Sequence, residues 1–461
     1  MAVLSVEDVV RGTQGALVAG DLGVPVTGVS IDSRHLGIGE AFFAIQGPNR
    51  DGHAFLRDAA ARGASCLVVH NLPDDLPPSV PTILVDDTTR ALGRLGAYHR
   101  ARFTVPVAAV TGSNGKTTTK EMVAAILETR GPALKTDGNL NNEIGVPLTL
   151  LRLSEEHRYA AIECGMNHLG EVARLAQWAD PDVAIVTNVG PVHLEGVGSV
   201  DGVAHAKGEL FHALRDGGVA VANTDDPRVM AQAKLSRRRL VTFGATHGSD
   251  VRLISAHHGG PGLRVELEFG GARHRVELKL IGTHNGHNAV AAAAVGVALG
   301  FDADSIVRGL ANATTPGRRM HPVRLPNGAL LIDDCYNANP SSTKAALLTL
   351  THLVKGKGRA IAVLGDMLEL GPTELDLHRD VGRFAAGAGL SLLVCFGTRA
   401  RALGEGAEEA GLPAKHIEYT DDPAEAVRLV QARVRPEDVV LVKGSRGMKM
   451  ERISDPLAGV Q

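Results

Sequence analysis

Short apolar runs alternate with longer amphipathic stretches along most of the chain. In the first hundred residues the apolar runs have the length and composition of strands, and the amphipathic stretches have helical spacing. The expected strands are residues 24–33, 41–45, 66–69 and 82–85, and the expected helices are residues 53–64 and 89–103. Strands that alternate with helices favour parallel sheets, so the pattern predicts an α/β fold.

The same alternation continues after a short connection at residues 103–106. Residues 105–110 carry no polar side chain, which is typical of a strand buried on both faces, and residues 118–130 continue as a helix. Further strands are expected at residues 159–163, 182–189, 218–223 and 239–244. The connection at 103–106 is the first predicted domain boundary.

Residues 250–282 interrupt this rhythm. Three segments there alternate polar and apolar residues around glycine-rich turns, which indicates an antiparallel meander. A helix is expected at 288–300, and Thr315-Pro316-Gly317 then breaks the pattern. The last part alternates again, with strands at 329–334, 359–365, 390–397 and 438–444 and helices from 341, near 378, and twice more before the last strand. We therefore predict three α/β domains: residues 1–104, 105–316 and 317–461.

Composition narrows the class of protein. The 48 Lys and Arg nearly balance the 51 Asp and Glu, and the net charge of -3 argues against nucleic acid and anionic membranes as partners. The longest apolar stretch, residues 289–300, is shorter than the roughly 20 residues of a membrane span. The N-terminal residues 1–13 are acidic where a signal peptide is basic. The four cysteines are scattered, which fits a reducing compartment, so we expect a cytoplasmic enzyme.

The segment TGSNGKTTTK, residues 111–120, resembles a phosphate-binding loop with a shortened front. Gly115, Lys116 and Thr117 match the end of the G-x-x-x-x-G-K-[ST] motif, but Val110 stands where its first glycine belongs and Gly112 is too close. A buried strand before the loop and a helix after it would direct backbone N–H groups at an anion. The nucleotide-binding candidates are Gly112, Ser113, Asn114, Gly115, Lys116, Thr117 and Thr118. The alternative is a tight turn that carries a solvated lysine.

This loop is similar to the ATP loop of the Mur ligases, which form amide bonds at the expense of ATP in peptidoglycan precursor synthesis. Other segments match in the same order and cover nearly the whole chain: IECGMNHLGE, TNVGPVHLEGVGS, AKGELF, GTHNGHNAVAAAA, TPGRRM and LIDDCYNANP. The resemblance implies ATP and Mg²⁺ as cofactors. It also implies an N-terminal domain for the UDP-muramyl substrate, a central ATP domain and a C-terminal domain for the incoming amine.

The resemblance also suggests roles for single residues. Thr117, Glu163, His193 and Lys207 would form the metal side, Lys207 as a carbamate. Asn285 would line the adenine, with Arg318 and Asp334 at the γ-phosphate and the nucleotide. The doubled arginine Arg318-Arg319 leaves the arginine contact open between two neighbours, and the preceding Pro-Gly favours Arg318. Catalytic roles are expected for Lys116, Lys207, His193 and Arg318. Taken alone, Glu163 could cap a helix, His193 could bond a loop carbonyl, Lys207 could be a surface lysine and Asp334 an ordinary strand-end charge.

Three segments favour the family member that adds D-alanyl-D-alanine. They are NNEIGVPLTLL with Asn141 and Asn142, DCYNANPSS with Tyr336 and Asn337, and GDMLELG. The N-terminal SIDSRHLGIGEAFF would bind the uridine nucleotide through Asp32, Ser33 and Arg34. The segment KGSRGMKM, residues 443–450, resembles a phosphate-binding glycine turn, and we expect it instead at the carboxylate of the dipeptide.

The implied reaction activates the carboxylate of UDP-N-acetylmuramoyl-tripeptide as an acyl phosphate, which the dipeptide amine attacks. We expect a monomer that closes around a hinge near residue 317. Another Mur-type ligase, a folylpolyglutamate synthetase-like ligase and a nucleotide-dependent switch protein remain as alternatives. The absence of an NPR motif argues against the ligase for the preceding amino acid, and the N-terminal DSR segment against the folylpolyglutamate type. The third residue of the tripeptide stays open.

Overall fold

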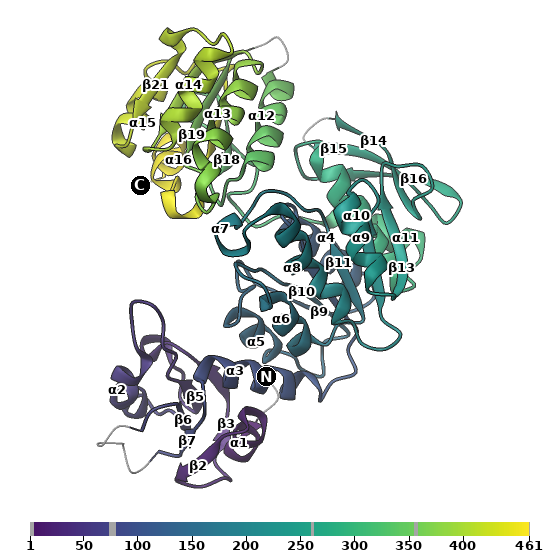
Figure 1. The fold of residues 1–461 in the computed structure, drawn as a ribbon, viewed down its shortest axis with the longest axis vertical. Helices are drawn as coiled ribbons and strands as arrows, with labels where there is room; N and C mark the ends of the chain where they lie inside the picture. The colour runs from purple at the N-terminus through teal and green to yellow at the C-terminus, as the bar shows by residue number, and fades with distance from the viewer. Residues whose placement is uncertain (1–3, 73–79, 260–261, 355–357, 461) are drawn as a thin grey trace.

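The computed structural model describes residues 4–72, 80–259, 262–354 and 358–460; residues 1–3 of the N-terminal stretch considered above lie outside it. Three α/β bodies follow one another along the long axis of the molecule (Figure 1). The α/β class with mostly parallel sheets is confirmed. In the described ranges, no helix combines the length and the apolar character that a membrane span requires.

The N-terminal body carries a five-stranded sheet in the order β2-β7-β6-β5-β4, and β1 pairs with β3 beside it. Helix α3 packs against α1 and also against α5 and α6 of the next body, so it joins the two. The elements are β1 (Leu4–Ser5), α1 (Val6–Thr13), β2 (Ala16–Ala19), β3 (Pro25–Val26), β4 (Gly28–Ser30), η1 (Ser33–His35), β5 (Glu40–Phe43), η2 (Gly52–Phe55), α2 (Leu56–Ala61), β6 (Cys66–Val69), β7 (Thr82–Leu84) and α3 (Thr88–Arg100).

The central body is built on a nine-stranded sheet in the order β16-β15-β14-β13-β12-β11-β8-β10-β9. The strands are β8 (Val107–Thr111), β9 (Ala133–Lys135), β10 (Tyr159–Glu163), β11 (Val183–Val186), β12 (Val219–Asn223), β13 (Arg239–Gly244), β14 (Val251–Gly259), β15 (Gly262–Phe269) and β16 (Ala272–Leu278). The helices are α4 (Lys116–Leu127), α5 (Gly145–Leu150), α6 (Glu171–Ala179), α7 (Leu194–Val197), α8 (Val200–His212), α9 (Pro227–Leu235), α10 (His284–Ala298) and α11 (Ala303–Asn312).

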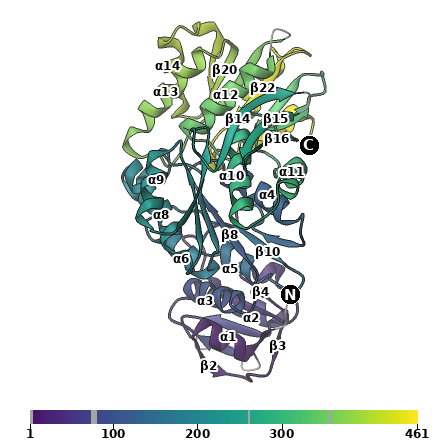
Figure 2. The ribbon, with the colours of Figure 1, turned by 90° about the vertical axis from the view of Figure 1, so that its right-hand side faces the viewer.

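Strand β8 lies in the middle of this sheet and is buried on both faces. Ala108 and Val110 belong to the core under α4, α10 and α11, whereas Val107 and Ala109 face the core under α5, α6, α8 and α9. Figure 2 shows α6, α8 and α9 on one side of the sheet and α4, α10 and α11 on the other. Helices cover both faces of the sheet at β8, so the loop that follows its carboxyl end starts from a buried strand.

The predicted meander is confirmed, because β14, β15 and β16 pair antiparallel. It is not a separate unit, since β14 continues the central sheet through a parallel pairing with β13.

The C-terminal body has a six-stranded sheet in the order β17-β18-β22-β19-β20-β21, parallel except for β17. Its elements are β17 (His321–Arg324), β18 (Leu330–Asp334), α12 (Pro340–Val354), β19 (Ala360–Gly365), η3 (Gly371–Thr373), α13 (Glu374–Ala386), β20 (Leu390–Phe396), α14 (Ala400–Glu409), η4 (Ala414–His416), β21 (Ile417–Thr420), α15 (Pro423–Gln431), β22 (Val439–Lys443), η5 (Arg446–Met448) and α16 (Glu451–Ala458). The apolar runs expected as strands form here, whereas the short edge strands β17 and β21 were not anticipated.

Candidate active site

A cavity of about 720 Å³ lies where the central and C-terminal bodies meet. Its central wall is formed by segments that follow β8, β9, β10 and β11, by the last residue of β12 and by the start of α10. Its other wall comes from residues 315–345 and from the segment after β22. The ends of parallel strands are the usual place for ligands in α/β sheets.

The glycine loop joins β8 to α4 at this cavity. Gly115 caps α4 with φ 79°, and no side chain caps the helix, so the first backbone N–H groups of α4 remain available to a ligand. The Lys116 ammonium donates to the Gly112 carbonyl oxygen at 2.8 Å. Burial lowers the pKa of Lys116, and the carboxylate of Glu163 acts against this. Gly112 itself is buried behind the loop and does not line the cavity.

Neighbouring loops and the C-terminal body hold the glycine loop in place. The Asn114 N–H donates to Asn188 Oδ1 at 2.9 Å, and its carbonyl accepts from Thr187 Oγ1 at 2.6 Å. From the C-terminal body, Asn339 Nδ2 donates to Asn114 Oδ1 at 2.7 Å, while Asn339 Oδ1 accepts from the N–H of Ser342 in the first turn of α12. One side chain thus caps a helix of one body and contacts the glycine loop of the other.

Glu163 ends β10 inside the cavity. Its Oε1 accepts from Asn141 Nδ2 at 2.8 Å, and its Oε2 is buried without a hydrogen-bond partner in the described structure. A buried carboxylate oxygen without a donor is costly unless a cation meets it. The described residues contain no cluster of three His, Cys, Asp or Glu side chains that would hold a metal by itself. Glu163 therefore fits a hard cation such as Mg²⁺, which keeps waters and substrate phosphates among its ligands.

Lys207 lies on α8 with a side chain that is almost fully buried, so the surface-lysine alternative is wrong. It forms no hydrogen bond or ion pair within the described ranges. Burial lowers the pKa of its amine well below the usual value, and the charge of Lys116 adds to this effect.

His193 lines the cavity in a left-handed conformation with φ 52°. Its Nδ1 is 2.7 Å from Oε2 of Glu369, which comes from the C-terminal body and has φ 64°. The imidazole lowers the pKa of the Glu369 carboxyl. The partner of His193 is therefore a carboxylate of another domain, and not the loop carbonyl considered above.

The start of α10 supplies an amide pair. Asn285 is buried and donates to the Ile281 carbonyl oxygen at 2.7 Å, and Asn288 donates to Asn285 Oδ1 at 2.8 Å. Both asparagines line the cavity.

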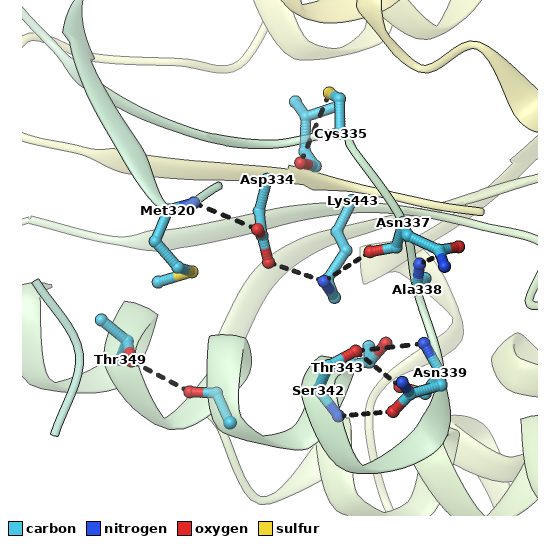
Figure 3. Close-up of polar contacts among 12 residues, drawn as sticks. Met320, Asp334, Cys335, Asn337, Ala338, Asn339, Ser342, Thr343, Thr349 and Lys443 are labelled. Atoms are coloured by element: carbon cyan, nitrogen blue, oxygen red, sulfur yellow. Dashed lines mark hydrogen bonds and ion pairs between the residues drawn. The ribbon is translucent and has the colours of Figure 1, made fainter. Parts of the chain in front are cut away.

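At the opposite wall, Asp334 and Lys443 end neighbouring parallel strands and form a buried ion pair of 2.6 Å (Figure 3). Lys443 also donates to the Asn337 carbonyl oxygen at 2.8 Å, and the Met320 N–H donates to Asp334 Oδ1 at 3.0 Å. Asp334 is therefore more than an ordinary strand-end charge, because it ties together three segments of the cavity wall.

Three family models match this chain. The Mur ligase middle domain matches residues 110–296, the domain described as "Mur ligase, glutamate ligase domain" residues 318–446, and the Mur ligase family catalytic domain residues 25–100. The UDP-N-acetylmuramoyl-tripeptide–D-alanyl-D-alanine ligase of Escherichia coli (strain K12) is 38% identical over 434 residues, which cover 93% of either chain. The chain belongs to the Mur ligase family.

Solved Mur ligase structures agree with this membership. A crystal structure of MurF from Acinetobacter baumannii has a TM-score of 0.91 at 34% identity and covers 100% of this chain and 99% of that one. The MurF ligase of Thermotoga maritima in complex with ADP has a TM-score of 0.83 at 28% identity, with 94% and 97% covered.

In this Mur ligase, the cavity brings together most of the residues that the sequence nominated. They are Ser113, Asn114, Gly115, Lys116, Thr117, Thr118, Asn141, Asn142, Glu163, His193, Asn285, Asp334, Tyr336 and Asn337. Lys207 and Gly112 do not line the cavity. The roles of all these residues remain predictions.

Two groups of nominated residues lie elsewhere. Asp32, Ser33 and Arg34 are in the N-terminal body, where Asp32 caps η1 and pairs with Arg34 at 2.6 Å. Arg318 does not line the cavity, because its guanidinium pairs with Asp333 at 3.4 Å and Asp455 at 2.9 Å. Its neighbour takes the cavity position that the sequence assigned to Arg318.

That neighbour, Arg319, is the second of the doubled arginines, and the sequence left the choice between the two open while favouring Arg318. Sequence reasoning did not single out Asn288, Asn339 or Glu369. Asn288 stands one helical turn after Asn285, and Asn339 precedes a proline at a helix start, so both carried a local signal. Glu369 lies in the GDMLELG segment that the resemblance singled out, but no local signal predicts its contact with His193, because that contact depends on how two domains meet.

Proposed function

We propose that this Mur ligase joins D-alanyl-D-alanine to UDP-N-acetylmuramoyl-tripeptide with hydrolysis of ATP to ADP and phosphate. The observation that carries the proposal is the shared cavity, where a glycine loop and a buried acidic strand end face the C-terminal domain. The name of the Escherichia coli relative and the ADP complex of the Thermotoga maritima relative support the substrates and the nucleotide.

The phosphoryl transfer would take place at the glycine loop. The γ-phosphate of ATP passes to the tripeptide carboxylate, and negative charge spreads over the phosphoryl oxygens. Lys116 and the free N–H groups of α4 would stabilise this charge, because they are held in place before the reaction. Arg318 would have to leave Asp333 and Asp455 to reach the phosphates.

The residues proposed to hold Mg²⁺ are Thr117, Glu163, His193 and Lys207. The ion would neutralise charge on the β- and γ-phosphates. Asn141 would orient Glu163, because its amide occupies one carboxylate oxygen and leaves the other, Oε2, for the ion. Lys207 fits only as a carbamate, since a neutral amine is a poor ligand for a cation that prefers oxygen.

Amide formation follows when the neutral amine of the dipeptide attacks the acyl carbon, phosphate leaves with the bonding electrons, and the nitrogen releases a proton to the phosphate or to water. The incoming amine would enter from the C-terminal wall, near Tyr336 and Asn337. The N-terminal domain would hold the uridine nucleotide, with Asp32, Ser33 and Arg34 at the sugar. We propose domain limits of 1–104, 105–316 and 317–461, a monomer, and a cytoplasmic location, where ATP is supplied.

A product-mass assay tests the proposal. The purified protein, ATP and Mg²⁺ are incubated with UDP-N-acetylmuramoyl-tripeptides that contain lysine or diaminopimelate, together with D-alanyl-D-alanine, D-glutamate or L-lysine. We expect a product that gains two alanine residues, and stoichiometric ADP. The Lys116→Ala variant should lose on the order of 10²-fold or more in rate. A product that gains one amino acid would indicate a sister ligase, and ADP release without either substrate would indicate a nucleotide switch.

A further inference from the structure

The C-terminal wall of the cavity carries a stack of one aromatic ring and two arginines. The Arg319 guanidinium lies 3.7 Å from the centre of the Tyr336 ring, and that of Arg446 lies 6.0 Å from it. All three side chains line the cavity. The Tyr336 N–H donates to the Arg318 carbonyl oxygen at 3.1 Å, which fixes the backbone next to Arg319. The ring therefore presents a guanidinium in a defined orientation.

Arg319 keeps all its donors free. Within the described ranges its guanidinium donates no hydrogen bond and forms no ion pair, and the Tyr336 hydroxyl has no hydrogen-bond partner either. Arg446 pairs with Glu451 at 3.2 Å and lies near the Tyr336 ring. Its side chain is exposed in spite of these two contacts, so part of its guanidinium remains available to a ligand. A planar guanidinium with five donors matches a carboxylate in a two-bond arrangement.

The other cations of the cavity are already committed. Among the described lining residues the lysines and arginines are Lys116, Arg319, Lys443 and Arg446. Lys443 is neutralised by Asp334, and Lys116 belongs to the glycine loop on the opposite wall. The cationic groups left to the C-terminal wall are thus those of the stack.

We propose that the Arg319–Tyr336–Arg446 stack binds the terminal carboxylate of the incoming dipeptide, with Arg319 as the main contact. The assignment rests on the proposed function. The dipeptide carries one carboxylate that the reaction leaves intact, and that group requires a counter-charge while the amine at the other end reacts. An extended dipeptide spans roughly 7 Å. A dipeptide held at this wall by its carboxylate therefore extends its amine into the cavity that the glycine loop also lines.

The test compares D-alanyl-D-alanine with its C-terminal amide, which lacks the negative charge. The enzymes are the wild type, Arg319→Gln, Arg319→Lys and Arg446→Gln. Arg324→Gln is the matched control, because Arg324 is an exposed arginine of the same domain whose guanidinium, among the residues that the structure describes, bonds only the Gly328 carbonyl oxygen. Melting temperature and ADP affinity show that each variant is folded.

We expect Arg319→Gln to raise the KM for the free acid by roughly 10- to 100-fold, with a smaller rise for Arg446→Gln. The KM for the amide, the KM for ATP and kcat should change little, so the preference for the acid collapses. Arg319→Lys should retain part of the preference for the acid, since the lysine ammonium keeps the positive charge but lacks the two-bond geometry of the guanidinium. Arg324→Gln should behave as the wild type.

An acid-to-amide preference that survives in both Gln variants would overturn the assignment. A fall in kcat or a rise in the KM for ATP with that preference intact would also overturn it and assign Arg319 to the phosphoryl group. A wild-type enzyme that ligates neither dipeptide but ligates a single amino acid would instead contradict the proposed function, and this assignment with it.

Discussion

Replacing Gly115 with alanine should destabilise the glycine loop in two ways, through backbone strain and through a steric clash with Asn288. Gly115 has φ 79°, a conformation that costs an L-residue about 1–2 kcal/mol. A Cβ atom there would also meet Asn288 Oδ1 well inside 3.0 Å, a separation that real Cβ atoms essentially never show. Gly217 is a matched control, because its φ is 78° and a Cβ atom there would have nothing within 4 Å.

The free-energy cost of the clash with Asn288 can be approximated from the contacts of that side chain. Asn288 is buried and donates to Asn285, so its amide has to move and lose a hydrogen bond when the methyl group enters. Leaving a buried polar group unsatisfied costs about 1–3 kcal/mol. We therefore expect Gly217→Ala to destabilise by about 1–2 kcal/mol and Gly115→Ala by about 2–5 kcal/mol.

Differential scanning calorimetry and ADP titration check this prediction. For a domain of this size, each kcal/mol lowers the melting temperature by about 2–4 °C. Gly217→Ala should keep the ADP affinity of the wild type, whereas Gly115→Ala should weaken it, because Gly115 and Asn288 both line the cavity. Equal melting temperatures for the two variants, or unchanged ADP binding in Gly115→Ala, would refute the reasoning.

Two further variants test other parts of the site. Lys207→Ala should abolish ligation, and added formate or acetate should restore part of the activity if Lys207 acts as a carbamate. Burial and the charge of Lys116 lower the pKa of the Lys207 amine, so that the neutral amine can react with CO₂. Rescue by small amines instead would show that the site needs a cation. Asn339→Ser should keep the cap of α12, since serine caps helices well, but should lose the contact with Asn114. We therefore expect kcat to fall while the melting temperature stays close to that of the wild type. An unchanged kcat would contradict a role of Asn339 at the glycine loop.

The parts of the fold that the sequence predicts are those with a clear hydrophobic pattern within a single element. The run at 105–110 is apolar on both strand faces, and the structure buries both faces of β8. The alternating residues of 250–282 form the antiparallel pairs of β14, β15 and β16. Strands β17 and β21 were missed because both are sheet edges of four residues, in which most side chains are exposed or only partly buried.

The site shows where local signals end. The glycine loop and Glu163 could be nominated because each follows a buried strand, and strand ends meet at one edge of a parallel sheet. Two adjacent arginines, by contrast, carry the same local signal, and which of them faces the cavity depends on their partners. Asp455, far along the chain, pairs with Arg318, and Tyr336 orients Arg319. Only the assembled C-terminal domain decides between them.

The contacts between the two domains bear on the order of the reaction. The C-terminal domain reaches the central domain through Asn339 at the glycine loop and through Glu369 at His193. The Asn114 amide oxygen and the His193 ring have these partners only while the C-terminal domain is docked. Because the same domain carries the stack that we assign to the dipeptide, we expect its docking to arrange the phosphate side of the cavity and to deliver the amine at the same time. Such coupling limits the time in which water, rather than the dipeptide, would meet an acyl phosphate.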